Sequence, residues 1–251
     1  MRIRSALVAL GLSSIAARPV AAAPCRPIMP VAQLVTPKDA AVPADGGVLV
    51  SWVPGDPSDG VATTDKGWSI KHGKRKLSVT TAVLAPGLVR YDADGAGVQQ
   101  FLDGDGKQLL SYTRAPAQAG AATVWAAAPE MKAIEMVRID RQRFSTTTYT
   151  AKLTTAVPAK AVAVIVYTYD KKAKADVALR WAKVAEGNTS ITLDWQGRSC
   201  GGMAQGTVAL QPANKLSLAW VDATGRVSAH SKVIGVTPVA DVPTPGVPRP
   251  E

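Results

Sequence analysis

The stretch Ala161-Val162-Ala163-Val164-Ile165-Val166-Tyr167-Thr168-Tyr169 is the most strongly strand-forming part of the chain. β-Branched and aromatic side chains suit a pleated sheet, and β-branched ones lose rotamer freedom in a helix. The run therefore predicts a β-strand. Because much of the remaining chain repeats this kind of sequence, the same stretch also indicates the fold class.

Shorter runs of the same character occur on both sides of this stretch, separated by turn-forming Gly, Pro, Asp and Asn. Residues 130–143 also fit a helical spacing in part, but we favour a strand there. Strands at such short intervals indicate an all-β protein built from antiparallel β-sandwiches. The predicted strands are 48–53, 67–71, 76–83, 88–91, 98–102, 108–112, 122–127, 133–139, 147–153, 161–169, 177–184, 190–195, 215–221 and 227–236.

Residues 114–120, Arg-Ala-Pro-Ala-Gln-Ala-Gly, have mostly small side chains and no apolar periodicity, which is typical of a linker. We therefore predict two β-sandwich domains, at 23–113 and 121–237. The tail at 238–251 contains repeated prolines, which would remove sheet donors, so it is predicted to be disordered. The tryptophans of the predicted strands are expected to anchor the cores: Trp52, Trp125, Trp181, Trp195 and Trp220.

The N-terminus has the pattern of a signal peptide. Arg2 and Arg4 precede an apolar run from Ala6 to Ala17, which is too short to span a bilayer of roughly 30 Å. Small residues follow at the positions that a signal peptidase reads, and cleavage is expected after Ala22. No later run of about 18 residues is continuously apolar. The mature protein is therefore expected to be exported, periplasmic or extracellular, with no transmembrane segment.

Cys25 and Cys200 are the two cysteines of the chain. An even number in an exported protein indicates a disulfide, which here would tie the mature N-terminus to a distant loop. Two unpaired thiols are the alternative. A lipid anchor on Cys25 is disfavoured because Pro24, rather than a small residue, precedes it.

Residues 216–231, Leu-Ser-Leu-Ala-Trp-Val-Asp-Ala-Thr-Gly-Arg-Val-Ser-Ala-His-Ser, resemble the last hairpin of bacterial fibronectin type III-like and immunoglobulin-like domains. The positions that match its V-D-A-x-G-x-x-S-x-x-S pattern are Asp222, Gly225, Ser228 and Ser231. Residues 36–47 resemble the lead-in to such a domain, although Ala40 replaces the usual glycine. The resemblance implies a sandwich fold and a binding, spacer or accessory module of the cell envelope, and it implies no activity.

One motif has the form of a catalytic site. Gly197-Arg198-Ser199-Cys200-Gly201 matches G-x-S-x-G, the nucleophile elbow of α/β-hydrolases, and Asp222 and His230 follow in the chain order of a triad. The elbow needs a strand that runs into a helix, whereas Gly202 and Gly206 follow here without a helical period. We therefore favour a glycine-rich loop over a serine hydrolase.

Metal ligands are scarce. His72 and His230 are the only histidines, which is too few for a zinc site with so few cysteines. Acidic oxygens for calcium occur in two adjacent loops, at Asp92, Asp94, Asp103 and Asp105. Asp-Gly pairs are usual in tight turns, however, and the loops lack the spacing and closing Glu of a calcium loop. We therefore predict no metal and no cofactor.

Positive charge is the clearest sign of a binding surface. The net charge is +10, and loss of Arg2, Arg4 and Arg18 with no acid would leave +7. The densest cluster, Lys71-His72-Gly73-Lys74-Arg75-Lys76, makes Lys74, Arg75 and Lys76 candidate contacts to an anionic polymer. Residues 171–174, Lys-Lys-Ala-Lys, repeat the theme. No aromatic residue interleaves with either cluster, so a stacking platform for single strands is not predicted. Solvated turns are the alternative.

Together these features predict a non-catalytic, exported binding or accessory module. The expected partner is an anionic polymer of the envelope or another envelope protein. The alternatives are an exported serine hydrolase that uses Ser199, and a structural spacer that has no specific ligand.

Overall fold

The computed structural model describes residues 31–53, 68–116, 125–141, 144–170, 174–194 and 215–239. Every regular element in these ranges is a β-strand, which confirms the all-β prediction. The strands are β1 (Val31–Leu34), β2 (Ala40–Val42), β3 (Val48–Val53), β4 (Ser69–His72), β5 (Arg75–Lys76), β6 (Val79–Ala85), β7 (Leu88–Ala93), β8 (Gly97–Leu102), β9 (Gln108–Arg114), β10 (Met131–Arg141), β11 (Phe144–Leu153), β12 (Ala161–Asp170), β13 (Ala175–Lys183), β14 (Ser190–Asp194), β15 (Lys215–Asp222) and β16 (Ile234–Val239).

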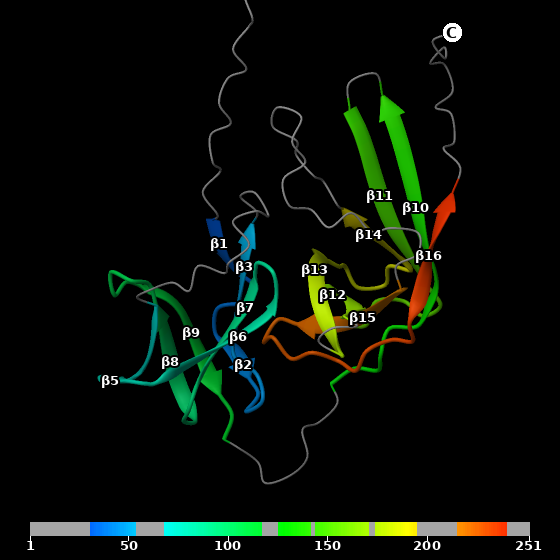
Figure 1. Cartoon of the computed structure of the whole chain (residues 1–251). Helices are drawn as coiled ribbons and strands as arrows, with labels where there is room; N and C mark the ends of the chain where they lie inside the picture. The colour runs from blue at the N-terminus through cyan, green and yellow to red at the C-terminus, as the bar shows by residue number, and fades with distance from the viewer. Residues whose placement is uncertain are drawn as a thin grey trace, which may run out of the picture.

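Strands β1 to β9, the first strand group, form two sheets that pack face to face (Figure 1). The orders are β1-β3-β7-β6 and β2-β9-β8-β4-β5. Apolar side chains from both sheets pack together in the space between the sheets. These side chains are almost fully buried, as expected for a β-sandwich. This core includes Val48, Val50, Val89 and Tyr91 from one sheet, and Ile70, Phe101, Leu110 and Tyr112 from the other.

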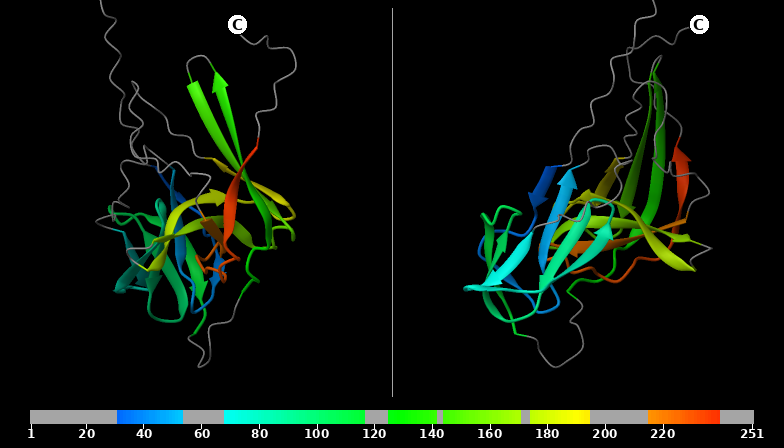
Figure 2. Two further views of the ribbon diagram at one scale, coloured as in Figure 1. Left: turned by 45° about the vertical axis from the view of Figure 1, so that its right-hand side comes forward. Right: turned by 60° about the vertical axis from the view of Figure 1, so that its left-hand side comes forward.

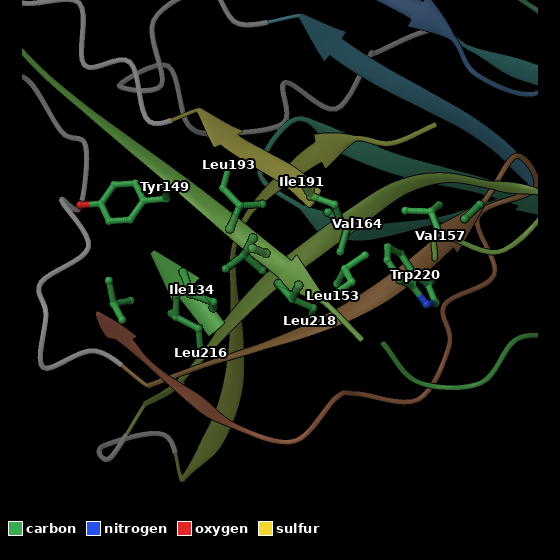
Figure 3. Packing of buried hydrophobic residues seen from close by; sticks show 14 residues of the cluster. Ile134, Tyr149, Leu153, Val157, Val164, Ile191, Leu193, Leu216, Leu218 and Trp220 are labelled. Carbon is green, nitrogen blue, oxygen red and sulfur yellow. The ribbon is translucent and has the colours of Figure 1, made fainter. Parts of the chain in front are cut away.

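Strands β10 to β16, the second strand group, form a seven-stranded sheet in the order β13-β12-β15-β16-β10-β11-β14. The sheet folds over at β16, which pairs antiparallel with β15 and parallel with β10. The two halves enclose a core in which Tyr149 lies at one end and Trp220 at the other (Figure 3). β10 and β11 pair from Met131 to Arg141 and form a hairpin that rises above the rest of the sheet (Figures 1 and 2).

A third cluster of buried side chains joins the two strand groups, which lie side by side (Figure 2). Leu49 and Leu88 contribute from the first group, and Ala163, Ile165 and Val221 from the second. Neighbouring residues of the same strands face the separate cores, because side chains alternate along a strand. Leu49 therefore lies between Val48 and Val50 of the first core. We call this third cluster the joint.

Most predicted strands are confirmed with shifts of a few residues at their ends. The segment for which a helix competed is the strand β10. The strands β1 and β2 were not predicted. The strand predicted at 122–127 is wrong where it can be judged, because Trp125 to Ala127 have no strand structure. Of the five tryptophans expected in the cores, Trp195 lies outside the described residues.

Three predicted boundaries also differ from the structure. The strand predicted at 227–236 begins only at Ile234, because residues 228–233 form an arm that bonds β15 partly through serine side chains. The disorder predicted from residue 238 is wrong at its first two residues, since Pro238 and Val239 pair with β10, and residues 240–251 lie outside the described residues. Proline is tolerated where a strand has a free side, and β15 pairs with β16 only at Ile234 and Gly235 among the described residues. Likewise Arg114, placed in the linker, belongs to β9.

A buried polar pair supports the first core. The Tyr112 hydroxyl donates to Gln99 Oε1 at 2.7 Å, and Gln99 Nε2 donates to the Gly95 carbonyl at 2.7 Å. Both side chains are buried, so the pair fixes the Asp94-Gly95 turn to the sheet. Burial raises the pKa of Tyr112 to about 12, with a lowering contribution from Arg114 and a raising one from Asp92.

We predict that the free energy of unfolding falls between pH 10 and pH 12. The reason is that the pKa of Tyr112 is 10.0 in the unfolded chain and about 12 in the folded one, so the unfolded chain loses this proton first. The loss should reach about 2 kcal/mol. Denaturant unfolding at several pH values measures it. The Tyr112→Phe protein should lose less stability over this pH range while being less stable at neutral pH. An identical pH dependence in both proteins would contradict the assignment.

Candidate functional site

The basic cluster forms a tight hairpin at one edge of the five-stranded sheet. Lys71 pairs with Lys76, and His72 pairs with Arg75, across β4 and β5. The turn is possible because Gly73 adopts a φ of 57°, a left-handed conformation that favours glycine. β5 is the outermost strand of this sheet (Figure 1).

The structure brings the three predicted binding residues together on this hairpin. Lys74, Arg75 and Lys76 are all exposed. None of them forms an ion pair with a residue that the structure describes. Their charge is therefore directed at solvent, and a multivalent anion can reach it. We call Lys74, Arg75 and Lys76 the basic hairpin.

The second basic cluster is described only in part. Lys171 and Lys172 lie outside the described residues, and Lys174 is exposed at the β12–β13 turn with a φ of 50°. Although no aromatic residue interleaves with the cluster in the sequence, aromatic side chains lie close to this end of the sheet. Tyr169 pairs with Asp176 across the same hairpin, and the Tyr167 ring stacks on His230.

Two of the aspartates considered for calcium, Asp92 and Asp103, are used by an ion pair and by a turn. Asp103 Oδ1 accepts from the backbone of Asp105 and Lys107 at 3.0 and 2.8 Å, which closes the β8–β9 turn. Asp92 pairs with Arg90 Nε at 2.9 Å. Among the described residues no group of three or more His, Cys, Asp or Glu side chains is placed to hold a metal ion.

The structure does not join Asp222 and His230 in a triad. Asp222 Oδ1 accepts from the backbone N–H groups of Thr224 and Arg226, and Asp222 Oδ2 accepts from Arg226 Nε at 2.8 Å. His230 Nδ1 instead lies 3.0 Å from Asp176 Oδ2. Ser199 lies outside the described residues, as do Cys25 and Cys200, so their predicted roles stay predictions.

The Asp222 turn, residues 222–226, connects the two strand groups. The Thr224 carbonyl accepts from Gly47 N–H at 2.8 Å, and the Ala223 carbonyl accepts from Thr36 Oγ1 at 2.6 Å. The Gly225 carbonyl accepts from Arg90 Nη1 at 3.0 Å. Sequence reasoning found this turn through its resemblance, but it missed the partner, because the contacts span more than a hundred residues.

Close approach explains the glycine of this turn. Gly225 has a φ of 74°, and a Cβ added there would lie 2.7 Å from Arg90 Cδ. A side chain at this position would therefore meet both backbone strain and a neighbouring side chain. Gly225, which matches the glycine of the family pattern, is therefore needed for the packing and backbone conformation of this turn.

We predict that Asp222→Ala lowers the free energy of unfolding by about 3 kcal/mol, because it leaves buried donors unpaired and removes the partner of Arg226. The Asp222 side chain is only 5 % exposed. Urea unfolding followed by tryptophan fluorescence measures the change. Asp176→Ala is the matched control, since its side chain is 40 % exposed, and it should cost less than about 1 kcal/mol. Equal effects of the two substitutions would contradict the assignment.

A small cavity of about 170 Å³ lies beside the joint, with Gln33, Leu88, Trp181 and Lys183 among its lining residues. It is smaller than the 300–1,000 Å³ or so that is usual for small-molecule sites. In the described part of the chain no helix is long and apolar enough to cross a membrane. No protein-family model matches the chain, and a comparison with curated proteins found none similar to it.

Proposed function

We propose that the chain is an exported, non-catalytic module of the cell envelope or the secreted fraction, and that its basic hairpin binds an anionic polymer. The single observation that carries this proposal is the exposure of Lys74, Arg75 and Lys76 on one short hairpin. Three neighbouring cations attract a polyanion more strongly than scattered ones, because each phosphate or carboxylate of the polymer meets its own charge.

The rest of the molecule fits a binding module better than an enzyme. Two residues of the triad order have other partners in the described part of the chain: Asp222 is used by a turn and His230 by a surface pair. The proposed organisation is two fibronectin type III-like or immunoglobulin-like sandwiches after a removed signal peptide. The enclosed cores of the two strand groups support it.

We predict that the mature protein co-sediments with envelope fractions at low salt and is released as salt rises toward about 0.3 M, where the screening length falls to roughly 6 Å. A triple variant, Lys74→Gln, Arg75→Gln and Lys76→Gln, should lose most of this binding. Sedimentation of purified protein across a salt titration measures both effects.

The matched control removes the same charge from other exposed positions, through Lys38→Gln, Lys132→Gln and Lys160→Gln. We expect it to keep most of the binding. Equal losses in the two triple variants would show that net charge alone is responsible. No binding at low salt would overturn the proposal and favour a structural spacer.

A further inference from the structure

Tyr169 is an exposed aromatic residue on the sheet face that also forms the joint. Tyr167, two residues earlier on β12, packs against the joint cluster, and alternation places Tyr169 on the same face. The two tyrosine rings differ in how much of their surface is open to a ligand. His230 stacks on Tyr167 with ring centres 4.2 Å apart, whereas Tyr169 is 54 % exposed. The face therefore continues beyond the joint with an aromatic ring that is open to a ligand.

A cation lies beside this ring. β12 and β15 pair at Thr168 and Leu216, so the same register places Lys215 opposite Tyr169 on the same face. The Thr168 hydroxyl also donates to the Lys215 carbonyl at 3.3 Å, which is consistent with this register. Lys215 and the nearby Lys174 are exposed and form no ion pair with the residues that the structure describes.

The acid of this surface already has a partner. Asp176, which is opposite Tyr169 on β13, is bound through Oδ2 to His230 Nδ1 at 3.0 Å. Asp176 keeps its negative charge on one side of Tyr169, and Lys215 and Lys174 are the described cations of this surface that have no ion-pair partner among the described residues. The surface therefore combines an exposed aromatic ring with a positive charge on the neighbouring strand, directly opposite the ring.

We propose that Tyr169 and Lys215 form a second binding site, which takes a pyranose ring of an acidic glycan. The apolar face of a sugar carries C–H groups that pack against the negative face of an aromatic ring. A carboxylate on that sugar reaches the ammonium group of Lys215 and forms a charge-assisted hydrogen bond. This site lies on the second strand group and does not depend on the basic hairpin.

The geometry favours a glycan over the other polyanions. Single-stranded nucleic acids are usually held by two or three stacked bases, whereas here the Tyr167 ring is already stacked against His230. An aromatic anchor that inserts into a membrane interface has to project from the molecule. Tyr169 lies instead on a sheet face that is bounded by the joint on one side.

The test measures binding of the full mature chain to an oligogalacturonate and to its methyl ester, which has the same backbone without the charges. We expect Tyr169→Ala to weaken binding of the acidic form about tenfold, as loss of about 1.4 kcal/mol of stacking predicts. Tyr169→Phe keeps the ring and should bind as the wild type does. Lys215→Gln should weaken binding of the acidic form and leave binding of the methyl ester unchanged.

Two controls match these substitutions. Val98→Ala removes an apolar side chain that is 59 % exposed on the first strand group, and Lys132→Gln removes an exposed lysine from β10. Both should bind the acidic form as the wild type does. When Tyr169→Ala is added to the basic hairpin triple variant, it should still weaken binding of the acidic form about tenfold. That result separates this site from the proposed function.

The proposal is overturned if Tyr169→Ala and Lys215→Gln bind both oligosaccharides as the wild type does. It is also overturned if Tyr169→Ala abolishes binding to oligothymidylate or to phosphatidylglycerol vesicles while binding to the oligogalacturonate is unchanged. Since Tyr169 lies at the surface, its substitution should leave the thermal unfolding midpoint nearly unchanged, and that measurement accompanies each binding assay.

Discussion

The arrangement of the two strand groups depends on the hydrogen bonds that the Asp222 carboxylate accepts. Its two oxygens hold residues 222–226 in a tight turn, and that turn presents three successive carbonyls to the first strand group. Thr36, Gly47 and Arg90 donate to these carbonyls from three separate segments. Because buried backbone carbonyls need partners, the turn and its donors are stable only together. The apolar joint beside them adds burial that neither strand group provides alone.

This arrangement has a consequence for binding. The basic hairpin lies on the first strand group and the proposed Tyr169 site on the second, and the joint packs the two groups against each other. Two weak sites at a constant separation bind a long polymer with higher avidity than either site alone, provided that the polymer spans both. A flexible linker between independent domains would reduce this gain. A spacer function would need the joint but neither surface.

Local sequence determined the strands well, because their β-branched and aromatic residues favour extended structure wherever they are packed. Prediction failed where pairing depends on other groups. The arm at 228–233 looked like a strand, but Ser228 and Ser231 bond β15 with hydroxyl groups as well as with backbone. The joint left a signal in the sequence: Val48-Leu49-Val50 and Ala161–Val166 lack alternation, and their residues face two different cores.

One candidate site could be predicted from local sequence and the other could not. The basic hairpin could be predicted because Lys74, Arg75 and Lys76 are consecutive and follow a turn-forming glycine. The Tyr169 surface could not, since Lys215 becomes its neighbour only through the register of β12 and β15. Sequence spacing gives no information about which residues are opposite each other on non-consecutive strands.

Native-state hydrogen exchange as a function of denaturant tests most directly whether the two strand groups form one cooperative unit. Its probes are the backbone amides of Leu49 in β3 and Ile165 in β12, which belong to different groups and meet at the joint. We expect their exchange to report the same unfolding free energy and the same dependence on denaturant. Two distinct free energies, with one strand group exchanging while the other remains protected, would contradict the account.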